Sequence, residues 1–82
     1  MEIVKTLGTI EDATALHRRR RVVVLRRADG HYAYAEQYHF VSEHEGEVVA
    51  EGWATLLAAG IYATAAIAEQ EARAAFPQWY GE

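Results

Sequence analysis

Cysteine is absent from this chain of 82 residues, and its absence excludes several kinds of site. Disulfide frameworks, thiolate zinc sites, iron–sulfur clusters and cysteine nucleophiles all require that residue. A domain this small commonly relies on disulfides, a metal or a second chain for part of its stability. Without thiols, we expect the fold to be held by side-chain packing or by association with another chain.

Long apolar runs are missing as well. No stretch approaches the ~20 apolar residues of a membrane span. The N-terminal residues, with Glu2 before Lys5, lack the apolar core of a signal peptide. Hydrophobic residues still make up 51% of the chain, which is too many for a disordered protein. We therefore expect one small domain over residues 1–82, located in the cytoplasm and without a membrane segment.

Positive charge is scarce in the second half of the chain. The net charge of −4 combines eight basic with twelve acidic residues. Six of the eight bases lie between Arg18 and Arg27, whereas Arg73 is the only base from Glu36 to the end. A basic segment followed by an acidic remainder can steer the approach of partners.

The clearest structural signal is a β-hairpin. Val22–Leu25 is a run of stiff, strand-favouring side chains, and the Asp29-Gly30 pair that follows is typical of a tight hairpin turn. The return strand is expected over residues 31–41, and a third antiparallel strand over residues 48–57 after a polar loop at residues 42–47. Gly52 inside that third strand indicates a bulge or a close backbone approach.

Two helices and a first strand complete the predicted order. Residues 2–7 favour a strand, and Thr9 with Asp12 resembles a capping box for a helix from Ile10 to about Arg18. Thr64 is a good N-cap for a helix over residues 65–76, which Pro77 ends. The order β-α-β-β-β-α predicts an α+β fold in which the C-terminal helix packs on one face of a three- to four-stranded antiparallel sheet. We expect the aromatic tail to cover the sheet edge.

The hairpin register determines which side chains share a face. A two-residue turn at Asp29-Gly30 would place the hairpin's aromatic side chains beside Arg19, Arg21, Leu25 and Arg27. Two arrangements follow: either the aromatic face is core beneath the alanine-rich helix, or it is exposed as a binding surface. The exposure of Tyr34 distinguishes them. The candidate interaction surface comprises Arg19, Arg21, Arg27, Tyr32, Tyr34, Tyr38, Phe40 and Trp79.

The arginine cluster also permits binding to nucleic acid. Arg18–Arg21, Arg26 and Arg27 could contact phosphates, and aromatic rings beside them could stack on bases. The element order resembles that of double-stranded RNA-binding domains. The start of the last helix, where that family carries lysines, reads Ala63–Ile67 here and has no base. Strand alternation also divides the arginines between two faces.

Patterns typical of catalysis or metal binding are lacking. The four histidines show no spacing of a known metal motif, Ser42 is the only serine, and the glycines form no phosphate-binding loop. Glu36 is the one carboxylate expected on the aromatic face, unless a bulge at residues 36–37, which we favour, turns it outward. We therefore predict no catalytic, cofactor-binding or metal-binding residues and no enzymatic activity.

Two segments resemble a group of small uncharacterised bacterial proteins, mainly proteobacterial and sometimes phage-borne. The first runs from Arg21 through Asp29-Gly30-His31-Tyr32, and the second from Gly60 to Trp79. Ile67 and Gln78 depart from the pattern of that group. The resemblance implies a fold and a bacterial source, and it carries no activity. We predict a non-enzymatic interaction or regulatory protein that acts through protein–protein contacts, including those of a homodimer, with a nucleic-acid-binding accessory as the alternative.

Overall fold

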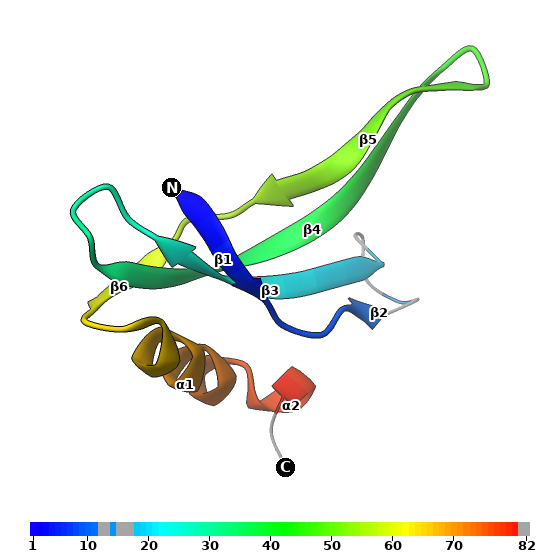
Figure 1. Ribbon diagram of the computed structural model, residues 1–82. Helices are drawn as coiled ribbons and strands as arrows, with labels where there is room; N and C mark the ends of the chain where they lie inside the picture. Colours follow the sequence, from blue (N-terminus) through cyan, green and yellow to red (C-terminus); the bar gives the residue numbers. More distant parts are fainter. Residues whose placement is uncertain (12–13, 15–17, 81–82) are drawn as a thin grey trace.

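The structure, a computed structural model, describes residues 1–11, 14 and 18–80. It is an α+β fold in which an antiparallel sheet carries helices on one face (Figure 1). The strands are β1 (Glu2–Thr6), β2 (Ile10–Glu11), β3 (Arg19–Arg26), β4 (Tyr32–His44), β5 (Glu47–Thr55) and β6 (Ala59–Tyr62). The main path through the sheet is β1-β3-β4-β5, while β2 pairs with β3 and β6 pairs with β4. The helices are α1 (Ala65–Ala75) and α2 (Pro77–Tyr80).

The β3–β4 hairpin is present, but its register differs from the predicted one by a residue. The Arg27 N–H donates to the His31 carbonyl at 2.7 Å, and the Gly30 N–H donates to the Arg27 carbonyl at 3.1 Å. The loop therefore has three residues, and Gly30, with φ +83°, adopts the left-handed conformation that ends such a loop. Val24 pairs with Tyr34, where a two-residue turn would have placed Leu25.

This register assigns the side chains of β3 and β4 to two faces. Paired residues of an antiparallel sheet share a face, and the faces alternate along each strand. Even-numbered residues such as Val22 and Tyr34 lie on the face that α1 and α2 cover, which we call the helix face. Odd-numbered residues such as Val23 and Ala35 lie on the opposite face, where they are buried in a second apolar cluster. We call this face the open face, because neither α1 nor α2 covers it. The predicted grouping of the tyrosines with Arg19 and Arg21 is therefore wrong.

Helix α1 forms as the sequence predicts. The Thr64 hydroxyl oxygen accepts from the Ile67 N–H at 3.2 Å, and the helix ends at Ala75 before Pro77. Its small side chains Ala68 and Ala72 are fully buried. They approach the sheet closely and leave room for the larger side chains around them. The core on this face comprises Leu7, Val22 and Ala72, packed with Tyr34, Phe76, Trp79 and Tyr80.

The segment after β1 differs from the predicted helix at its start. Ile10 and Glu11 form strand β2 and pair with Arg20 and Arg19, because the edge of β3 is open there. The Glu11 carboxylate also faces Arg19 at 3.2 Å. The rest of the predicted helix, including Asp12 of the expected capping box, lies outside the described residues apart from Thr14 and Arg18, neither of which is helical.

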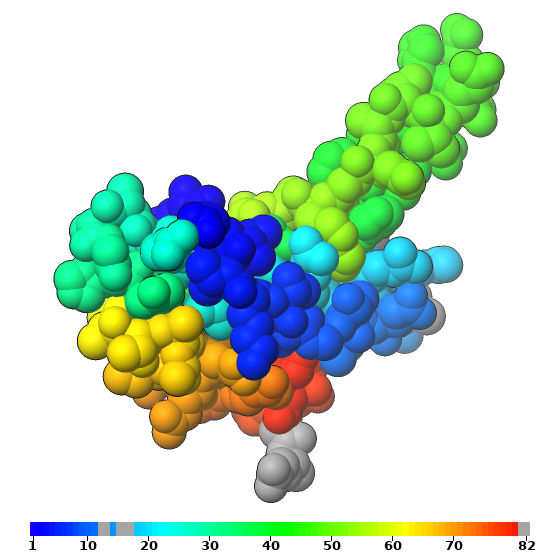
Figure 2. Space-filling view, viewed as in Figure 1, coloured from blue at the N-terminus to red at the C-terminus, as the bar shows by residue number. Residues whose placement is uncertain are grey.

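Strands β4 and β5 extend past the body of the molecule as a two-stranded arm, defined here as residues 40–52 (Figures 1 and 2). The predicted polar loop over residues 42–47 is wrong, since only Glu45 and Gly46 lie between the strands. The register shifts beyond Ser42, and no shift occurs at Gly52. Gly52 instead makes space for Phe40, whose ring lies 3.6 Å from the position that a Cβ would take.

Candidate interaction surface

The predicted interaction surface is divided between the two faces of the sheet. Tyr34 is half-buried on the helix face, with its ring centroid 6.2 Å from that of Tyr62 and 6.3 Å from that of Phe76. Trp79 stacks on Phe76 with 5.1 Å between ring centroids. The aromatic side chains at this position therefore belong to the core beneath α1, the first of the two arrangements considered from the sequence.

The other predicted aromatic residues are half-buried members of β4. Tyr32 pairs with Tyr62 of β6, Tyr38 lies opposite Arg20, and Phe40 covers Gly52. Arg27 lies at the hairpin turn, where its Nε donates to Asp29 at 3.1 Å and a terminal nitrogen reaches the Gly60 carbonyl at 3.4 Å. Tyr32, Tyr38 and Arg27 therefore belong to the body of the molecule and Phe40 to the base of the arm, and they do not form one continuous exposed ladder.

The open face carries a different cluster, centred on Trp53 of β5. The Arg21 guanidinium lies 4.1 Å above the centre of the Trp53 ring, and His39 contacts the ring edge-on with 5.3 Å between centroids. Arg21 Nε donates to Gln37 Oε1 at 2.8 Å, and Gln37 Nε2 donates to Thr55 Oγ1 at 2.8 Å. Because Gln37 is only 3% exposed, both ends of its amide are satisfied by fixed neighbours that hold Arg21 over the indole.

Next to this cluster lies an apolar groove of about 590 Å³. It forms where the chain bulges out between β5 and β6, and Ala58 packs there against the buried Val23, Leu25 and Ala35. Leu57 is 95% exposed. The groove is lined by Met1, Ile3, Leu25, Thr55, Leu56, Leu57 and Ala58.

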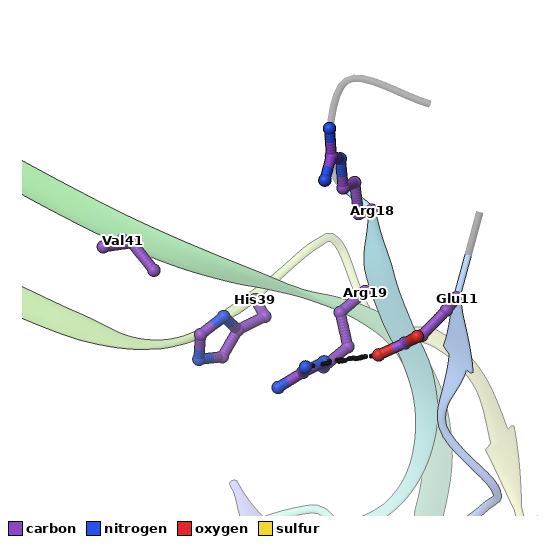
Figure 3. Close-up of a pocket in the computed structure, with 5 residues that line it drawn as sticks. All are labelled: Glu11, Arg18, Arg19, His39 and Val41. Atoms are coloured by element: carbon purple, nitrogen blue, oxygen red, sulfur yellow. Dashed lines mark hydrogen bonds and ion pairs between the residues drawn. The ribbon is translucent and has the colours of Figure 1, made fainter. Parts of the chain in front are cut away.

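A cleft of about 490 Å³ opens where β3 and β4 diverge, at the base of the arm (Figure 3). Arg18 and Arg19 line one side, while His39 and Val41 lie on the β4 side and Glu11 faces Arg19. The side chains offer cationic and imidazole nitrogens beside a single carboxylate. The cleft therefore suits an acidic group of a partner.

Most arginines of the basic segment face carboxylates of the same chain. Arg20 lies 3.6 Å from Glu36, which the regular β3–β4 pairing places on the helix face, so the bulge favoured at residues 36–37 is wrong. Arg26 contacts Glu2 at 2.6 Å, and the hydrogen bond from this carboxylate raises the pKa of Arg26. At the hairpin turn, the His31 backbone N–H lowers the pKa of Asp29, with a further contribution from Arg27.

Sequence reasoning found Arg19 and Arg21 but missed the residues around them. Trp53 and His39 share the open face with Arg21 only when the hairpin loop has three residues. Asp29-Gly30 is compatible with that longer loop, in which the glycine closes the turn. Leu56 and Leu57 are exposed because the strand bulges before β6, and no local sequence motif indicated that bulge.

The part of the chain that the structure describes holds no metal-binding cluster and no membrane-spanning helix. No group of three or more metal-ligating side chains occurs within residues 1–11, 14 and 18–80. In the same residues, no helix is long and apolar enough to cross a membrane. No protein-family model matches the sequence, and searches of curated proteins and of solved structures found no match. The resemblance to small bacterial proteins therefore stays a prediction.

Proposed function

We propose that this protein is a small non-enzymatic interaction protein that binds a partner protein through the open face of its sheet. The supporting observation is the gathering of exposed apolar side chains around the groove. Leu57 is 95% exposed, Met1 71%, Leu56 45% and Ile3 44%. A contiguous exposed apolar patch of this kind typically marks an interaction site.

The Arg21–Trp53 cluster adds specificity beside the groove. Tryptophan and arginine are the residue types most enriched among the dominant contacts of protein interfaces. The stacking on Trp53 and the bond to Gln37 fix the Arg21 guanidinium, so little rotamer entropy is lost on binding. We propose that the partner presents apolar side chains to the groove and a carboxylate to Arg21.

The charge distribution favours a protein partner over a nucleic acid. Arg19, Arg20, Arg26 and Arg27 each lie within ion-pair distance of a carboxylate. Phosphate binding would have to compete with these pairs and with a net charge of −4. The observation that supports the nucleic-acid alternative is the shared cleft of Arg18 and Arg19. We further propose that the protein acts in the bacterial cytoplasm, as its cysteine-free sequence and its resemblance suggest.

The test is capture of a partner by immobilised protein, comparing two matched substitutions. Leu57→Asp places a charge on the open face, and Ile67→Asp makes the same apolar-to-acid change on α1, where Ile67 is 41% exposed. We expect a specific host protein to be retained by the wild type and by Ile67→Asp. It should be lost with Leu57→Asp and weakened by Trp53→Ala.

Circular dichroism must first show that each variant is folded. The proposed function is wrong if no specific partner is retained by the folded wild type. It is also wrong if Leu57→Asp captures the same proteins as the wild type.

A further inference from the structure

The arm is a structural element with too little support from its own chain. It is a two-stranded ribbon, and such a ribbon is marginally stable in water unless further strands or a helix pack against it. Its strands also carry exposed apolar side chains: Val41 is 48% exposed, Val48 57% and Val49 63%. The arm therefore has the properties of an element that a second chain completes.

One edge of the arm is open along β4. On the side of β3, the last pair in the ladder is Arg20 with Tyr38. Among the described residues, no strand pairs with β4 beyond that point on this side. Every second residue within 40–44 consequently presents an N–H and a C=O that no described strand pairs, which is the form of edge that accepts another strand. The edge leads directly to the cleft of Arg18 and Arg19.

We propose that two copies of this chain form a dimer by pairing their β4 strands, antiparallel, along this open edge. The two arms would join into a four-stranded ribbon in the order β5-β4-β4-β5. The dimer goes beyond the proposed function, because the second copy binds at a surface other than the open face. It uses the arm and leaves the apolar groove free.

Symmetry and charge select the register of the pairing. A two-fold axis perpendicular to the ribbon keeps each residue on its own face, and directly opposed residues of an antiparallel pair must share a face. One residue at the centre therefore lies opposite the same residue of the partner chain. Centring on Glu43 would place two carboxylates opposite each other, which is destabilising. Centring on Val41 would bring the partner's strand into the place that β3 occupies beside Tyr38. Centring on Ser42 avoids both problems and pairs Phe40 with the partner's His44.

The register also brings opposite charges together. With Ser42 at the axis, the turn of each arm reaches the cleft of the other copy. Each turn carries Glu45 between Glu43 and Glu47. The cleft offers Arg18, which makes no ion pair with a described residue, and Arg19. Because the axis repeats the contact, the dimer has two such charge contacts. The outer edge of β5 contains Glu47 and Glu51 but no base, so charge favours the β4 edge.

The lack of native cysteine allows a direct test by disulfide trapping. Residues directly opposite in an antiparallel pair have Cα atoms about 4.5–5.5 Å apart, within the range of a disulfide. Ser42→Cys should therefore form a covalent dimer under mild oxidation. Ala50→Cys is the matched control, since Ala50 lies opposite Ser42 on the outer strand. We expect Ala50→Cys to cross-link at least about tenfold more slowly.

A charge exchange tests the contact in the cleft. In sedimentation or light-scattering measurements at low salt, Arg18→Glu and Glu45→Arg should each weaken the wild-type dimer about tenfold or more, since each change affects two contacts. The double variant should recover most of the loss. Arg73→Glu on α1, remote from the arm, should leave the dimer unchanged.

Three results would overturn the dimer. These are a wild-type chain that stays monomeric up to about millimolar concentration, faster cross-linking of Ala50→Cys than of Ser42→Cys, or no recovery in the double variant. A monomeric chain that still captures a partner through Leu57 would refute the dimer alone. A dimer trapped at Ser42 without any such capture would instead refute the open-face function.

Discussion

Tyr80 links the C-terminal end of the chain to the sheet through a single hydroxyl. Strands β1 and β2 both lie along β3, and the Leu7 N–H still donates to the Val22 carbonyl at 2.9 Å. The pairing is then interrupted at residues 8–9. The Tyr80 hydroxyl oxygen accepts from the Val22 N–H at 3.1 Å and donates to the Gly8 carbonyl at 2.7 Å. The hydroxyl thus replaces the missing strand partner. Burial raises the pKa of Tyr80.

Replacing Tyr80 with phenylalanine removes these hydrogen bonds while keeping the ring. The Val22 N–H would lose its acceptor, and an unsatisfied buried donor costs about 1–3 kcal/mol. We expect Tyr80→Phe to lower the free energy of unfolding by about 1–2 kcal/mol, measured by urea denaturation with an unchanged slope. Equal midpoints for variant and wild type would show that water replaces the hydroxyl at no cost.

Among the helices and strands, the sequence predicts correctly those whose determining residues lie close together in the chain. Thr64, the alanines of α1 and Pro77 define that helix from nearby residues alone. The hairpin was also predicted, because Asp29-Gly30 is a local turn signal. Its loop length was not, since the same dipeptide closes two-residue and three-residue loops. A one-residue slip moves every side chain to the other face.

That slip explains which parts of the candidate site were missed. Charge alone marks Arg19 and Arg21 as candidates, so their place in the site does not depend on the face they occupy. The neighbours of the tyrosines depend on the hairpin register, and a one-residue error gives them the wrong ones. Trp53 joined the site only through the register between β4 and β5. Such pairings depend on contacts distant in sequence, which local patterns do not encode.

The ion pair between Lys5 of β1 and Glu69 of α1 makes a pH-dependent contribution to stability. Hydrogen bonds from Lys5 and Arg73 lower the pKa of Glu69 from its ordinary value of 4.5. The folded state therefore binds this proton less readily than the unfolded state. The stabilisation is fully present above about pH 4.5 and is lost as the pH falls through the lowered folded-state pKa.

Glu69→Gln isolates this contribution. The difference in unfolding free energy between wild type and variant should be largest near neutral pH and should shrink steadily below pH 4.5. Urea denaturation across that range measures it. Glu71→Gln on the exposed side of the same helix is the control, and its difference from wild type should be small throughout. A Glu69→Gln difference that stays constant with pH would refute the role of the Lys5–Glu69–Arg73 cluster.

For the whole molecule, the basic segment found in the sequence is largely neutralised in the fold. Glu2, Glu11, Asp29 and Glu36 come from four separate parts of the chain, and each faces an arginine of β3 or of the adjoining turn. Among the described residues, those without an ion pair include Arg18 at the cleft and Glu43, Glu47 and Glu51 on the arm. This separation suits association between copies better than contact with a phosphate backbone, which needs several unpaired cations on one surface.

Retention on heparin decides between these two uses of the arginines. We expect the wild type to elute below about 0.15 M salt, where the Debye length is about 8 Å, because its arginines are paired and its net charge is −4. The double variant Glu11→Gln with Glu36→Gln would release Arg19 and Arg20 and should bind more tightly. Strong wild-type retention that falls steeply with salt would favour the nucleic-acid alternative. Unchanged retention in the double variant would show that the ion pairs do not control access to these arginines.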